Sequence, residues 1–205
     1  EYYNGEQTSR FFMASLVDVG GIELHKIPGM ERLAVHRFMM ARKPYLMLCY
    51  QQWKTPEVIG PSLNRCLVYT IYRTNAFRPT QYASNPDKRK LERERMEWFV
   101  ENARRLEEAG WRPITRARAS GRQVYCERYG EGDTIYFAVI SIAKEPQKSV
   151  LALDLESLGL KGAKIDVSEV ARDAPVKSAS DDEVARVELT LAPDKAQVIQ
   201  VRRGK

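Results

Sequence analysis

Apolar residues along the first half of the chain alternate between strand-like runs and helix-like spacings. Residues 11–17 are mainly apolar and predict a buried strand that ends at Asp18. Apolar positions then recur at helical spacing over residues 30–42. Residues 44–50 are apolar throughout, as expected of a strand covered on both faces, and helical spacing returns over residues 57–72. This order of strand and helix predicts βα units and a parallel sheet.

A third helix is predicted over residues 86–109, after a short strand near residues 72–77. Asn85 suits the N-cap, and Pro86 suits the first helical position because it has no N–H to leave unpaired. Gly110 suits the left-handed conformation that closes a helix. We therefore expect a helix with well-defined ends between the two halves of the chain.

The periodicity changes from helix to strand after Trp111. Residues 185–191 alternate strictly between apolar and polar side chains, which indicates one buried and one wet face. Short strands separated by tight turns, with no long helix between them, are typical of an antiparallel β-sandwich. The predicted strands are 124–129, 134–142, 149–155, 163–170, 185–191 and 196–201.

The βα units are too few to form a closed barrel. A (β/α)8 barrel takes about 250 residues and eight strand–helix units, whereas residues 1–110 contain two or three. An open three-unit sheet would leave edges that tend to pair with another chain. Residues 1–5 show no initiating Met and are typical of the interior of a longer polypeptide. We expect the domain to be completed by a further barrel portion or a companion chain.

Charge and hydropathy exclude two classes of partner. The chain has 205 residues and a net charge of +6. Residues 1–85 carry 10 basic and 6 acidic side chains, residues 86–110 carry 7 and 7, and residues 111–205 carry 16 and 14. Because the excess is spread thinly, a nucleic-acid partner is not expected. No run approaches the ~20 apolar residues of a membrane helix, so we predict a soluble protein. Nothing in the sequence directs it to a compartment.

Several phrases of the sequence resemble TIM-barrel glycoside hydrolases. The phrases of the first half are residues 11–23, 43–46 and 102–115, which resemble the carboxyl-terminal part of the barrel. Residues 124–130, 136–139 and 192–199 resemble the β-sandwich appended to it. The resemblance implies that residues 1–110 are the last βα units of a (β/α)8 barrel and residues 111–205 an antiparallel β-sandwich. It also implies a carbohydrate substrate.

Two acidic residues are candidates for the catalytic chemistry that this resemblance implies. Glycosidases need two carboxyl groups, one to protonate the leaving oxygen and one to attack or to activate water. In a barrel, catalytic residues follow the carboxyl ends of strands, and Asp18 and Glu23 follow the first predicted strand. The partner carboxylate would then lie in other barrel strands, so this chain alone is expected to be inactive. A structural interpretation stays open, in which Asp18 caps a turn and Glu23 is solvated.

Three further residues are candidates for substrate binding. Tyr50 and Trp53 follow the second predicted strand, and aromatic rings pack on the apolar faces of sugars. His25 follows Glu23 closely, whereas His36 lies inside a helix and is expected to be structural. Each of the aromatic residues has an equally open role in the core or in a loop.

No metal or cofactor is expected. The three cysteines, Cys49, Cys66 and Cys126, lack the spacing of metal ligands, and no dinucleotide or phosphate-loop motif is present. The acidic run 181–183 is expected to be a solvated turn. A noncatalytic carbohydrate-binding or structural protein on the same scaffold is the alternative function.

Overall fold

The structure of the chain is a computed structural model that describes residues 18–24, 29–49, 56–74, 85–170 and 174–204. The chain divides into two compact units, residues 1–104 and residues 105–205. We call them the parallel unit and the two-sheet unit. Within the described residues, no helix has the length and hydropathy needed to cross a membrane.

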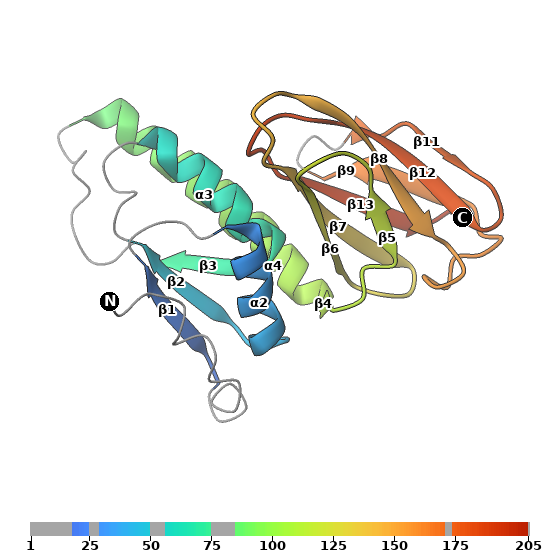
Figure 1. The fold of residues 1–205 in the computed structure, drawn as a ribbon, viewed down its shortest axis with the longest axis horizontal. Helices are drawn as coiled ribbons and strands as arrows, with labels where there is room; N and C mark the ends of the chain where they lie inside the picture. The colour runs from blue at the N-terminus through green and yellow to red at the C-terminus, as the bar shows by residue number, and fades with distance from the viewer. Residues whose placement is uncertain (1–17, 25–28, 50–55, 75–84, 171–173, 205) are drawn as a thin grey trace. The chain divides into compact units, whose positions relative to one another are not determined.

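The parallel unit contains a three-stranded parallel sheet with a helix after each strand (Figure 1). Its strands are β1 (Gly20–Leu24), β2 (Tyr45–Cys49) and β3 (Ile71–Thr74), and they lie in chain order, β1-β2-β3. Its helices are α2 (Met30–Met40), α3 (Pro56–Val68) and most of α4 (Pro86–Ala109), whose last residues, from Arg105 on, belong to the two-sheet unit. The predicted alternation of helix and strand is confirmed from α2 to α4. The first strand was not predicted at its place, because β1 lies at residues 20–24, and the strand expected at residues 11–17 lies outside the described residues.

Helix α2 packs its apolar side chains against β2. Met30, Leu33 and Met40 are buried, as are Tyr45 and Met47 of the strand. The chain also passes very close to α2 at Gly20, where a Cβ atom would lie 2.6 Å from Met40 Sδ. Glycine at this position therefore lets β1 and α2 approach each other.

Helix α4 begins and ends as the sequence predicts. The carbonyl of Asn85 accepts a hydrogen bond from Arg89 N at 3.1 Å, as the residue preceding a helix does. At the other end, Gly110 has φ +84° and its N–H donates to Leu106 O at 3.0 Å. Trp111 follows and is buried, with its indole Nε1 donating to Glu127 Oε2 at 2.8 Å.

The two-sheet unit consists of antiparallel ladders in two sheets. The six-stranded sheet has the order β10-β9-β13-β7-β6-β4 and the four-stranded sheet the order β11-β12-β8-β5. The predicted strands are found as β6 (Val124–Tyr129), β7 (Thr134–Ser141), β8 (Gln147–Asp154), β9 (Ile165–Glu169), β12 (Val184–Leu191) and β13 (Gln197–Arg203). Four very short strands were not predicted, namely β4 (Trp111–Arg112), β5 (Ala117–Ala119), β10 (Ala174–Pro175) and β11 (Ser178–Ser180).

One hydrophobic core joins the two sheets. Phe137 of β7 and Ile199 of β13 come from the six-stranded sheet, and Leu151 of β8 and Val187 of β12 from the four-stranded sheet. All four are fully buried. Strand β12 shows the strict alternation of buried and exposed positions that its sequence predicts.

Candidate functional site

The carboxyl ends of the three parallel strands meet at one edge of the sheet. Residue pairing aligns Glu23 of β1 with Leu48 of β2, and Leu48 with Thr74 of β3. These residues are at or next to the last position of their strands. In α/β enzymes, ligands bind at this edge, because the loops that follow the strands gather there.

The structure places the two predicted acids at opposite ends of β1. Asp18 is exposed and precedes the strand, whereas Glu23 is its fourth residue. From Gly20 to Glu23 alone the strand rises ~10 Å, and Asp18 lies two residues further back. Glycosidase carboxyl pairs lie about 5 to 9.5 Å apart. The backbone positions of the two residues therefore lie at opposite ends of β1, and Glu23 is the acid at the carboxyl edge.

The predicted substrate-binding residues lie outside the described residues. His25 directly follows the last residue of β1, and Tyr50 directly follows the last residue of β2, with Trp53 three positions further along. Their roles stay predictions.

His36 and Tyr45 form a buried polar pair close to the start of β2. His36 Nδ1 lies 2.8 Å from the Tyr45 hydroxyl, and the two rings stack with centroids 5.1 Å apart. Burial, and to a smaller extent the charge of Arg32, lowers the pKa of His36 to about 4, so the imidazole is neutral at pH 7. Tyr45 is the first residue of β2, so this pair lies near the amino end of the strand. Glu23 aligns with Leu48, near the carboxyl end of the same strand. His36 is therefore structural, as predicted.

A charged arginine is buried beside this pair. Arg37 is fully buried, donates from Nη1 to the hydroxyl of Thr70 at 2.8 Å and also donates from Nη2 to the carbonyl of Lys43. Lys43 precedes β2 and Thr70 precedes β3. The guanidinium group thus ties α2 to the segments that lead into two strands, which is a structural role that the sequence did not reveal.

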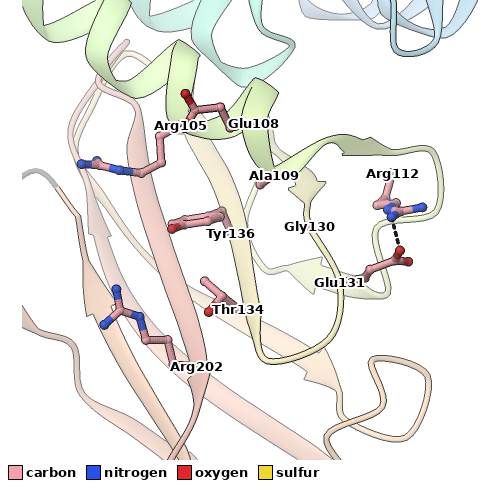
Figure 2. A pocket seen from close by; sticks show the side chains of 9 residues that line it. All are labelled: Arg105, Glu108, Ala109, Arg112, Gly130, Glu131, Thr134, Tyr136 and Arg202. Carbon is pink, nitrogen blue, oxygen red and sulfur yellow. Dashed lines mark ion pairs between the residues drawn. The ribbon is translucent and has the colours of Figure 1, made fainter.

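A pocket in the two-sheet unit was not predicted (Figure 2). It has a volume of about 530 Å³. The last turns of α4 contribute Arg105 and Glu108, β4 contributes Arg112, and the β6–β7 turn contributes Glu131. Arg112 and Glu131 form an ion pair, which Figure 2 marks with a dashed line.

The strand side of the pocket adds hydroxyl groups and a further cation. Thr134 and Tyr136 of β7 lie two residues apart, and Arg202 of β13 pairs with Thr134 across the ladder. Tyr136 is held in place by Gln200, whose Nε2 donates to the phenol oxygen at 2.8 Å. These groups come from segments far apart in the sequence, so no local motif indicated them.

Metal ligands and disulfides are not found among the described residues. No three His, Cys, Asp or Glu side chains gather there. Asp181 Oδ1 instead accepts the backbone N–H groups of Glu183 and Val184 at 3.0 and 2.7 Å, which confirms the predicted turn. Cys66 and Cys126 are free thiols, and burial raises the pKa of Cys126 above its ordinary value. The side chain of Cys49 lies outside the described residues.

No protein-family model matches the chain, and no curated protein matches it in sequence. Solved structures do match in fold. AmyP in complex with maltotriose superposes with a TM-score of 0.52 at 10% identity, covering 85% of this chain and 44% of that one. An Anoxybacillus α-amylase, described as pointing to a new glycosyl hydrolase subclass, superposes with a TM-score of 0.50 at 12% identity, covering 97% and 51%. This chain thus spans about half the length of the structures it matches. The predicted resemblance to glycoside hydrolases is confirmed at the level of fold.

Proposed function

We propose that the chain is the carboxyl-terminal portion of a glycoside hydrolase that cleaves glycosidic bonds by carboxylate acid–base chemistry. In this proposal, β1 to α4 are the last βα units of a (β/α)8 barrel, and the two-sheet unit is its appended antiparallel β-sandwich. The observation that carries the proposal is the strand order. Parallel strands that follow one another in chain order, with a helix after each, are the repeating unit of a (β/α)8 barrel.

The exposure of β2 supports a larger barrel. Leu46 is 39% exposed, whereas its neighbours Tyr45 and Met47 are buried. Parallel sheets are normally covered on both faces, and inward side chains of a closed barrel pack in layers. In a complete barrel, the exposed face of β2 that carries Leu46 would point into the barrel and be covered by side chains of the other strands.

The outer surface of α2 supports the same interpretation. Phe38 is 66% exposed and Val35 is 43% exposed, three positions apart on the helix and away from its buried residues. Neighbouring helices of a complete barrel would cover such side chains. Among the described strands, β1 and β3 pair only with β2. Each of them therefore has one edge at which a further barrel strand could pair.

Glu23 is the proposed catalytic carboxylate of this portion. It lies at the carboxyl edge of the sheet, where barrel enzymes place their chemistry. Its partner carboxylate is proposed to come from other barrel strands. The role of Asp18 rests on the sequence alone, as do the proposed substrate contacts of His25, Tyr50 and Trp53.

The substrate is proposed to be a carbohydrate, with maltooligosaccharides as the first choice to assay. One structural neighbour was solved in complex with maltotriose. The test compares the 205-residue chain with a polypeptide that also carries the preceding barrel units. We expect hydrolysis from the longer polypeptide and none from the 205-residue chain.

Amide variants of the longer polypeptide then identify the catalytic acid. Glu23→Gln is expected to lower kcat by about 10³-fold, since general acid–base groups contribute roughly 10² to 10⁴. Glu188→Gln, on the exposed face of β12, is the matched control and should leave kcat unchanged. Turnover by the 205-residue chain alone, or an unchanged kcat for Glu23→Gln, would refute the proposal. Sugar binding without any turnover would favour the noncatalytic alternative.

A further inference from the structure

The pocket of the two-sheet unit carries more positive charge than its own carboxylates neutralise. Arg105, Arg112 and Arg202 line it, against Glu108 and Glu131. Glu131 is already engaged by Arg112. All of these residues belong to the two-sheet unit, so the pocket does not depend on the parallel unit.

A fourth arginine adds positive charge next to Arg112. Arg128 of β6 lies directly opposite Arg112 of β4 in the antiparallel register. Directly opposite side chains have Cβ atoms about 4.5 to 5.5 Å apart, and like charges at such positions destabilise a sheet. Burial, together with the charges of Arg112 and Arg116, holds the pKa of Arg128 below its ordinary value, although the charge of Glu131 opposes this shift. The fold therefore tolerates a repulsion that a bound anion would relieve.

Hydrogen-bonding groups near Arg112 are also incompletely satisfied. The Nε atoms of Arg112 and Arg128 are buried and have no hydrogen-bond partner among the described residues. Buried N–H groups usually have a hydrogen-bond acceptor. An oxygen atom of a bound ligand could serve as the acceptor for these groups. Arg112 lines the pocket, and Arg128 is its neighbour because β4 pairs with β6.

The hydroxyl groups of the pocket are arranged as donors. The phenol oxygen of Tyr136 accepts from Gln200, which leaves the phenol proton available for a ligand. Thr134 lies on the same face of β7 because side chains two residues apart point the same way. Figure 2 shows these two side chains with Arg105 and Arg202 on either side of them.

We propose that this pocket binds a small molecule that carries an oxyanion, either a phosphate or a carboxylate, together with hydroxyl groups. Guanidinium groups match the geometry of both anions. A volume of about 530 Å³ exceeds what a single ion needs and lies in the range of pockets for small ligands. A sugar phosphate or a sugar acid has both the charge and the hydroxyl groups. The residues that form this pocket belong to the two-sheet unit, so the proposal does not rest on the catalytic proposal.

The test is isothermal titration calorimetry of the 205-residue chain at constant ionic strength. The ligands are glucose 6-phosphate, glucuronate, inorganic phosphate and glucose. We expect at least one of the two charged sugars to bind and glucose not to bind. Comparison of the charged sugars tells phosphate from carboxylate, and inorganic phosphate shows how much of the affinity the anion alone supplies.

Two pocket variants and one control link the binding to these residues. Arg202→Gln should weaken binding by about tenfold or more, and Tyr136→Phe by about three- to tenfold, as expected for a charged and a neutral hydrogen bond. Arg186→Gln removes an exposed arginine that pairs with Asp181 outside the pocket, and should leave binding unchanged. Thermal unfolding checks that each variant folds.

Three results would overturn the proposal. They are no binding of any oxyanion, equal binding of glucose and the charged sugars, and equal effects of Arg202→Gln and Arg186→Gln. Should Arg202→Gln fail to fold, Tyr136→Phe decides the question, since it keeps the ring and removes only the hydroxyl group.

Discussion

Protonation of His36 is expected to destabilise the parallel unit below neutral pH. His36 is 2% exposed, and its Nε2 atom is buried without a hydrogen-bond partner among the described residues. A charged imidazole there would lose its hydration and meet the positive charge of Arg32. The folded state therefore holds the neutral form.

The size of the effect follows from the two pKa values. Unfolding returns His36 from a pKa of about 4 to the ordinary 6.5, so between these values the unfolded chain binds a proton that the folded chain does not. The contribution is fully present above pH 6.5, falls as the pH falls, and is lost below pH 4. Each pKa unit corresponds to about 1.4 kcal/mol, so the loss is about 3 kcal/mol in total. Roughly 2 kcal/mol of it falls between pH 7 and pH 5.

Urea unfolding followed by circular dichroism at 222 nm measures this loss, because the helical signal comes mainly from α2, α3 and α4. The comparison is the fall in unfolding free energy from pH 7 to pH 5 in the chain and in His36→Phe, which cannot be protonated. His25→Phe is the matched control, since the chain has two histidines. The reasoning is refuted if His36→Phe keeps the pH dependence of the unmodified chain, or reduces it no more than His25→Phe does.

Two further predictions concern the stability of the two-sheet unit, measured by urea unfolding with tryptophan fluorescence. Gly130→Ala should cost about 2 kcal/mol or more, because Gly130 has φ +83° and its new Cβ would lie 2.8 Å from Thr134 O. Gly132→Ala, with φ +75° and open space around it, should cost about 1 kcal/mol, and equal costs for the two would contradict the steric argument. Phe137→Ala should cost about 3 to 5 kcal/mol, since Phe137 is fully buried between the sheets. A loss below 1 kcal/mol would show that this core is not tightly packed.

Local signals were sufficient to predict the elements whose ends are set by neighbouring residues. Helix α4 is the clearest case, because Asn85, Pro86 and Gly110 determine both ends through backbone chemistry alone. The longer strands of the two-sheet unit were also predicted, since their five to eight residues suffice to show alternation. Strands of two or three residues, such as β4, carry no such pattern and form only because a longer neighbour supplies the ladder.

The parts that depend on distant residues could not be predicted. The sequence predicted no strand over Gly20–Leu24, whereas these residues form β1, which pairs with β2 along its whole length. Glu23 was recognised from its place beside an apolar run, although the strand that carries it begins after Asp18. For the pocket, the sequence gives no signal at all, because its groups meet only after the antiparallel sheet has formed.

Amide hydrogen exchange along the edges of the parallel sheet tests most directly whether this unit is part of a larger barrel. The measurement compares β1 and β3, resolved by residue, in the 205-residue chain and in the polypeptide extended by the preceding barrel units. We predict that amides of β1 and β3 that point away from β2 exchange rapidly in the 205-residue chain and become protected in the longer polypeptide. Strong protection of these amides in the 205-residue chain alone would contradict the account, because it would show that both edges are already paired.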